Sequence, residues 1–118
     1  MNLSIQAIAR AFSGYDFEAA YPYLADDVSW RIVGGEQLTG KAAVVGACEQ
    51  SAAYLAEATT EFQRFRTLVC ENWVVIVSLA DYTDTEHKTS TVASCDIYDF
   101  QDGMLSEISS YNIELTER

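Results

Sequence analysis

Hydrophobic and polar residues alternate with a period of two from residue 59 to the end of the chain, which predicts consecutive β-strands. These strands are expected at Thr59–Cys70, Trp73–Tyr82, Thr89–Phe100 and Met104–Leu115, with turns at 71–72, 83–88 and 101–103. The last turn contains Asp102-Gly103, and Asp-Gly between two β-rich segments is a strong hairpin signal because glycine readily adopts positive φ. We therefore expect four successive antiparallel strands.

Before residue 59, apolar residues recur at helical spacing instead. Helices are predicted at Leu3–Phe12, ended by Ser13-Gly14, at 17–27 with Asp16 as its cap, and at Lys41–Glu57 with Thr39 as its cap. Pro22 lies inside the second of these helices and is expected to kink or restart it. The segment Val28–Val33 is predicted to be a strand whose apolar face carries Trp30 and Ile32.

The predicted order of elements is two helices, a strand, a helix and four strands, which indicates an α+β fold with helices on one face of a curled sheet. We expect residues 1–118 to form one domain with a single core. The stretch WVVIVSLA, which begins at Trp73, is apolar on both faces, whereas helices can cover only one face. The other face needs a second cover, so a homodimer packed through the outer face of the sheet is expected.

The composition narrows the classes of partner. Hydrophobic residues make up 49% of the chain and aromatic residues 12%, which indicates a folded globule. A net charge of −11 with only seven Lys and Arg residues argues against nucleic acids and anionic membranes, and favours a neutral or apolar small molecule. Neither a long apolar run nor a signal-peptide pattern is present, so we expect no membrane span and a cytoplasmic location.

Metal and cofactor sites are not expected. The cysteines, Cys48, Cys70 and Cys95, are widely spaced and form no CxxC pair, so we expect them to be reduced. The single histidine, His87, lies in a polar turn, where it is expected to be solvated unless that turn reaches a pocket. One histidine without clustered acids gives no convincing set of metal ligands.

Asp96 is the residue whose chemistry most needs an explanation. Alternation places it in the middle of a strand, on the face that also carries Val92, Ser94, Tyr98 and Phe100. A carboxylate in such surroundings is costly unless it is hydrogen-bonded, paired or protonated. Two interpretations stay open: a catalytic or ligand-orienting acid, and a structural acid satisfied by nearby Tyr, Ser or Asn side chains.

Three segments occur in a characteristic order: GYDFEAAYPYLADDVSWRIVGG, LTGKAAV and CDIYDFQDGMLSEISSYN. Together they resemble the SnoaL-like family of the NTF2-like superfamily, and the resemblance covers nearly the whole chain. It implies a cone-shaped α+β fold in which three helices and a curved, mainly antiparallel sheet enclose a largely apolar pocket. This superfold hosts isomerases, cyclases, epoxide hydrolases, dehydratases and proteins without known activity, so the resemblance indicates the fold more strongly than the function.

The resemblance also implies which side chains face the pocket. They are Trp30 and Ile32 on the first strand, Val77 and Leu79 on the third, Ser94 and Asp96 on the fourth, and Ile108, Ser110 and Asn112 on the last. Leu55 and Phe62, together with Trp30, are expected to set the pocket volume. Trp30 is more readily explained as part of the core than as a ligand contact, because it buries a large area. Ser110 and Asn112 can bind a ligand or satisfy Asp96.

Asp96 falls where ketosteroid-isomerase-like members keep a protonated aspartic acid that donates a hydrogen bond to a developing oxyanion. Ile32 replaces the general-base aspartate of those isomerases, Ile8 replaces their oxyanion tyrosine, and Ser110 replaces an acid of epoxide hydrolases and some cyclases. Three functions are therefore expected as alternatives. One is a cofactor-independent isomerase, cyclase or lyase that acts on an apolar or polyketide-like ligand, with Asp96 as its acid. The others are ligand binding without chemistry, and dimeric assembly.

Overall fold

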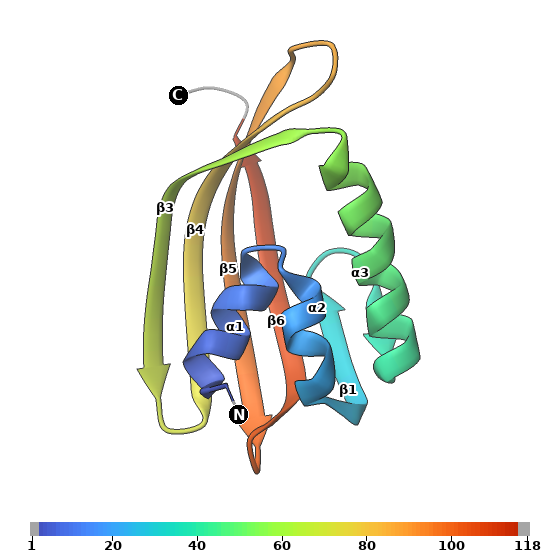
Figure 1. Cartoon of the computed structure of the whole chain (residues 1–118). Helices are drawn as coiled ribbons and strands as arrows, with labels where there is room; N and C mark the ends of the chain where they lie inside the picture. Colours follow the sequence, from blue (N-terminus) through green and yellow to red (C-terminus); the bar gives the residue numbers. More distant parts are fainter. Residues whose placement is uncertain (1–2, 116–118) are drawn as a thin grey trace.

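The computed structural model describes residues 3–115, and Figure 1 labels its elements. The helices are α1 (Ile5–Ser13), α2 (Phe17–Ala20) and α3 (Lys41–Ala56), with a 3₁₀ turn at Tyr21–Tyr23. The strands are β1 (Leu24–Ile32), β2 (Gln37–Thr39), β3 (Thr59–Cys70), β4 (Trp73–Thr83), β5 (Thr89–Gln101) and β6 (Met104–Leu115). They form one sheet in the order β2-β1-β6-β5-β4-β3, in which β1 and β6 are parallel and the other neighbours antiparallel. The expected α+β architecture is confirmed.

All three helices lie on the concave face of the curved sheet (Figure 1). α1 packs against β3, β4 and β5, and α3 packs against β1, β2 and β3. α1 begins where the Ser4 hydroxyl accepts a hydrogen bond from the Ala7 amide, and it buries Ile8 and Phe12 against the sheet. None of the described helices is long and apolar enough to cross a membrane.

The chain between α2 and α3 differs from the prediction in three respects. The predicted helix 17–27 ends at Ala20, Pro22 lies in the 3₁₀ turn, and β1 begins already at Leu24. Pro22 ends the helix because it has no N–H to donate, and Leu24 is fully buried in an extended conformation. The short strand β2 was expected to be part of a loop. Gly40, with φ of 96°, is the N-cap of α3, so the predicted cap at Thr39 is wrong.

The inner face of the sheet changes from apolar to polar at the same level on three adjacent strands. The strand pairings of β4, β5 and β6 align three rows of side chains: Val74, Tyr98 and Ile108; then Ile76, Asp96 and Ser110; then Ser78, Ser94 and Asn112. The first row is fully buried with residues of α1, α2 and α3. The core therefore fills one end of the curved sheet, and the polar rows begin where the core stops.

Candidate functional site

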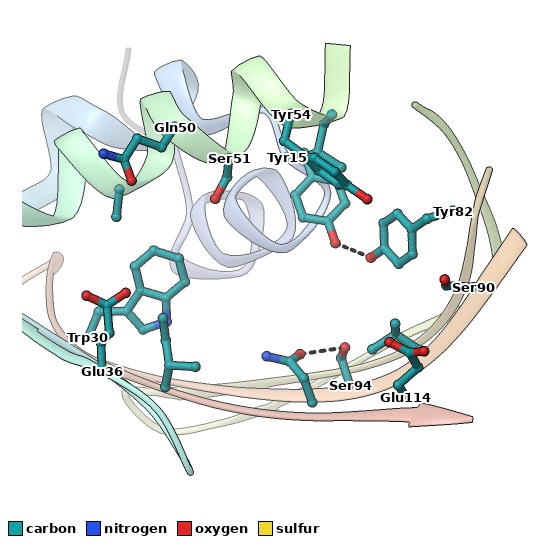
Figure 2. Close-up of a pocket in the computed structure, with 15 residues that line it drawn as sticks. Tyr15, Trp30, Glu36, Gln50, Ser51, Tyr54, Tyr82, Ser90, Ser94 and Glu114 are labelled. Carbon is teal, nitrogen blue, oxygen red and sulfur yellow. Dashed lines mark hydrogen bonds between the residues drawn. The ribbon is translucent and has the colours of Figure 1, made fainter. Parts of the chain in front are cut away.

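Two connected cavities lie between the helices and the polar rows of the sheet. The first, which we call the inner chamber, has a volume of about 220 Å³ and is lined by Asp96 and Ser110 among others. The second, which we call the mouth, has a volume of about 590 Å³ and is lined by residues of α3, among them Gln50 and Tyr54 (Figure 2). Both cavities are lined by Tyr15, Trp30, Ile32, Ser51, Ser94 and Asn112, so together they form one pocket.

Asp96 is held in the inner chamber by two serine hydroxyls. Ser13 donates a hydrogen bond to Asp96 Oδ2 at 2.8 Å, and its oxygen lies 2.5 Å from the hydroxyl of the fully buried Tyr98. The Ser110 hydroxyl also hydrogen-bonds to Asp96, while its oxygen accepts the Trp30 indole N–H at 2.9 Å. Two hydrogen-bonded pairs, Tyr98–Ser13 and Trp30–Ser110, therefore contact the Asp96 carboxyl group through their serine hydroxyls.

Burial and these hydrogen bonds act on Asp96 in opposite directions. Burial raises the pKa of the Asp96 carboxyl, because removal from water disfavours the charged form. The hydrogen bonds from Ser110 and Ser13 lower that pKa and offset part of the rise, since they stabilise the carboxylate. The net shift is upward, so Asp96 keeps its proton to a higher pH than an exposed aspartic acid. Such a carboxyl can donate a hydrogen bond or a proton to a ligand in the inner chamber.

The next polar row supplies an amide. Ser94 donates a hydrogen bond to Asn112 Oδ1 at 2.7 Å, and Figure 2 marks this contact on the floor of the mouth. Within residues 3–115, the Asn112 amide nitrogen makes no hydrogen bond, so its two N–H groups are available to an oxygen of a ligand.

A pair of tyrosines that the sequence did not single out forms one wall. The hydroxyls of Tyr15 and Tyr82 hydrogen-bond to each other across the pocket (Figure 2). Tyr15 lies in the turn after α1 with φ of 72°, and its ring stacks on Phe62. Burial, as the largest cause, raises the pKa of both phenols, so both stay protonated hydrogen-bond donors. No spacing could reveal them, because the chain has seven tyrosines and these two are 67 residues apart.

Every charged residue within 3–115 that lines the pocket is an acid. Asp96 lies in the inner chamber, and Glu36 and Glu114 line the mouth. His87 is exposed in the turn between β4 and β5 and is not among the lining residues. Among residues 3–115, no group of three or more His, Cys, Asp and Glu side chains could hold a metal ion.

The pocket brings together seven of the residues predicted for it. Trp30, Ile32, Ser94 and Asn112 line both cavities, Asp96 and Ser110 line the inner chamber, and Leu55 lines the mouth. Trp30 is partly buried against the core, as expected, and it also lines the pocket, so its contact with a ligand stays a prediction.

Four of the predicted placements are wrong. Val77 and Leu79 lie on the outer face, since they pair with Cys95 and Ala93 while Ile76 and Ser78 face the helices. β4 is apolar on both faces, so hydrophobicity could not determine the phase of its alternation. Ile108 is fully buried in the core below Ser110. Phe62 lines neither cavity because a bulge in β3 turns it toward Phe65, and Tyr15 covers it.

Comparison with known proteins gives one family. The model of the SnoaL-like domain matches residues 5–108. An NTF2-like protein of unknown function from Cytophaga hutchinsonii is 34% identical, with a TM-score of 0.81 over 91% of this chain and 94% of that one. A protein of Xanthomonas campestris pv. campestris, proposed to be a polyketide cyclase, is 18% identical, with a TM-score of 0.72 over 91% and 85% of the two chains. None of the curated proteins matches the chain.

Proposed function

Because the chain belongs to the SnoaL-like domain family, we propose that it binds a small, largely apolar molecule in the pocket and acts on an oxygen of that molecule through Asp96. The ligand is of the apolar or polyketide-like kind, and the reaction class is a cofactor-independent isomerisation, cyclisation or elimination. The observation that supports this proposal best is the placement of Asp96. A carboxyl with a raised pKa faces a chamber walled by Phe12, Phe17 and Trp30.

The neighbouring polar groups fit a ligand with a carbonyl or hydroxyl group. Protonated Asp96 donates a hydrogen bond to the ligand oxygen, and charge that develops on that oxygen is stabilised more strongly in a dry chamber than in water. Ser110 orients the carboxyl, and the free N–H groups of Asn112 lie one row further toward the mouth. Apolar side chains, among them Ile32 and Leu55, contact the body of the ligand.

Ligand binding without chemistry is the second candidate, and Ile32 favours it. This side chain lines both cavities at the position where a general base would face the ligand. Glu36 and Glu114 are the remaining carboxylates of the pocket, and both are exposed at the mouth. A protein that only binds needs no base, whereas an isomerase must use one of these acids or a water molecule.

One experiment separates the two candidates. The protein is incubated with 1-tetralone in D₂O, binding is followed by chemical-shift changes, and exchange of the ketone α-protons is followed by proton NMR. We expect saturable binding, faster α-proton exchange than in buffer, and loss of this acceleration in Asp96→Asn, which keeps the shape of the side chain but cannot donate a carboxylic proton. Binding without accelerated exchange selects the non-catalytic candidate.

A matched variant tests the role of Asp96 in binding. Asp96→Ala should weaken binding of 1-tetralone by about 3- to 12-fold, the value of one neutral hydrogen bond. Asp99→Asn is the control, because Asp99 lies on the same strand and pairs with Glu107 on the outer face. Equal affinities in the wild type and Asp96→Ala would show that Asp96 does not contact the ligand.

We also propose a homodimer through the outer face of the sheet. Apolar side chains of β3, β4 and β6 lie exposed on that face: Leu68, Trp73, Val77, Tyr111 and Ile113. Arg64 and Arg66 flank these side chains on β3, and Glu107 lies on β6 on the same outer face. A second copy related by a twofold axis can therefore cover the apolar residues and bring opposite charges together.

A further inference from the structure

The charged side chains that line the mouth have one sign. Glu36 and Glu114 line the mouth, and among residues 3–115 no Lys, Arg or His side chain lines either cavity. Within the described part of the chain, the carboxylates of Glu36 and Glu114 make no hydrogen bond or ion pair. The net charge of −11 adds to the same negative potential. An anionic group would be repelled from the mouth and a cationic group attracted to it.

Aromatic rings line the same opening. Tyr15, Tyr54, Tyr82 and Trp30 all line the mouth, and Figure 2 shows the three tyrosines gathered at one end of it. The Tyr54 side chain is 64% exposed, so its ring is accessible to a ligand. A cation near the face of an aromatic ring is attracted by the ring quadrupole, which at exposed sites contributes about 0.5–1 kcal/mol. Carboxylates combined with aromatic rings suit an alkylammonium group.

The two ends of the pocket lie at a defined separation. Ser110, which hydrogen-bonds to Asp96, and Glu114 are four residues apart on the same face of β6. At about 3.3 Å per residue, their Cα atoms are about 13 Å apart. A ligand that reaches both positions has an oxygen at one end and its charged group at the other, with an apolar body between them.

We propose that the ligand of this pocket is an amine, whose oxygen-bearing apolar end enters the inner chamber and whose ammonium group lies in the mouth between Glu114 and the tyrosine rings, which gather at the same end of it (Figure 2). The inference rests on the proposed function, because it specifies the ligand of the same pocket. It narrows the ligand class from neutral apolar molecules to positively charged ones.

Three phenols that differ only at the end of their alkyl chain test the inference. They are tyramine, which is cationic, 4-ethylphenol, which is neutral, and 3-(4-hydroxyphenyl)propionate, which is anionic. Their dissociation constants are measured by titration calorimetry at low ionic strength and again with added salt. We expect tyramine to bind about 3- to 30-fold more tightly than 4-ethylphenol, from one cation–π contact and one exposed charge pair. The anion should bind most weakly, and salt should reduce these differences.

Charge-neutralising variants show whether a carboxylate of the mouth causes the preference for tyramine. In Glu114→Gln, the preference for tyramine over 4-ethylphenol should fall to about two- to fivefold, the share left to the aromatic rings. Binding of 4-ethylphenol itself should not change. Glu107→Gln is the matched control, since it removes one negative charge from the outer face of the same strand, β6. The control should keep the full preference.

The outcomes separate the inference from the function on which it rests. If 4-ethylphenol binds as tightly as tyramine, or the anion binds most tightly, the amine assignment is wrong while the pocket remains a ligand site. The assignment is also wrong if Glu114→Gln and Glu107→Gln reduce the preference equally, because the effect then comes from net charge alone. If none of the three phenols binds to the wild type, the amine assignment and the proposed function both fail.

Discussion

The Asp96 carboxyl receives hydrogen bonds from two serine hydroxyls, and each serine oxygen in turn contacts an aromatic donor. Such an arrangement fixes the orientation of the carboxyl group and leaves its remaining lone-pair positions for the inner chamber. It also confirms the structural one of the two interpretations that the sequence left open, whereas the catalytic one stays a prediction. The Asp96 carboxyl is hydrogen-bonded by neighbouring side chains and also lines the inner chamber. Its structural role is therefore compatible with a role in the pocket.

Ser13→Ala tests the hydrogen bond that Ser13 donates to Asp96. This variant removes a hydrogen bond that stabilises the carboxylate, so the pKa of Asp96 should rise further. The measurement is carbon-detected NMR of the Asp96 carboxyl over a pH titration. Ser94→Ala is the control, because the Ser94 hydroxyl bonds to Asn112, and it should leave the pKa of Asp96 unchanged. An equal or lower pKa of Asp96 in Ser13→Ala would show that Ser13 does not stabilise the carboxylate.

The raised pKa of Asp96 also makes stability depend on pH. The folded protein keeps the Asp96 proton at pH values where the unfolded chain has already released it. The free energy of unfolding therefore falls as the pH rises from about 3.9, the value of a free aspartate, through the pKa of folded Asp96. Urea unfolding of the wild type and Asp96→Asn at several pH values measures this effect. The wild type should lose stability relative to Asp96→Asn across that window, whereas a relative gain would show a lowered pKa.

At the scale of elements, two β-bulges decide which side chains share a face. A register shift between Phe62 and Arg64 places Phe62 and Phe65 on the inner face of β3. A second shift places Leu105 and Ile108 together on the inner face of β6. Both bulges therefore bring large apolar residues three positions apart to the same side, which strict alternation does not allow.

The conformation of the β5–β6 turn should require its glycine, Gly103, whereas α3 should not require Gly46. Asp102 and Gly103 both have positive φ, 54° and 81°, so Gly103→Ala should lower the free energy of unfolding by about 1 kcal/mol. Gly46 lies inside α3, and an added Cβ would meet nothing within 4 Å. Gly46→Ala should therefore raise the free energy of unfolding by about 0.5–1 kcal/mol. Urea unfolding measures both, and a loss of stability in Gly46→Ala would contradict the packing of α3.

Regular alternation and turn residues made the second half of the chain predictable. All four long strands were predicted to within one residue, because each ends at a polar turn and all except the doubly apolar β4 show a clear period of two. β2 was missed because a three-residue strand leaves no pattern and forms only by pairing with β1. Asp96 was identified as a polar residue within an apolar strand. Tyr15 and Tyr82 were not, because only tertiary packing brings them together.

At the scale of the whole molecule, the two faces of the curved sheet differ in what covers them. The helices and the pocket occupy the concave face, and the convex face exposes apolar residues such as Ile113, which is 63% exposed. Contiguous exposed apolar surface is unusual on a monomeric protein and is typical of an interaction site. The pocket and the proposed dimer face lie on opposite sides of the sheet, so one can be altered without the other.

Ile113→Lys tests the dimer. A second copy would bury this side chain, so a charge there should convert a dimer into a monomer, as measured by size-exclusion chromatography with light scattering. Val33→Lys is the control, because Val33 is similarly apolar and exposed but follows β1, away from the outer residues of β3–β6. A wild-type protein with the mass of one chain would contradict the dimer.

The most direct test of Asp96 as the acid of a ligand pocket is the pKa of its carboxyl, measured by carbon-detected NMR with and without 4-ethylphenol. Asp96→Asn assigns the resonance. We predict a pKa above about 3.9, the value of free aspartate, and a further change when 4-ethylphenol is bound. A pKa at or below the free value, with no response to 4-ethylphenol, would show that Asp96 is not the acid of this pocket.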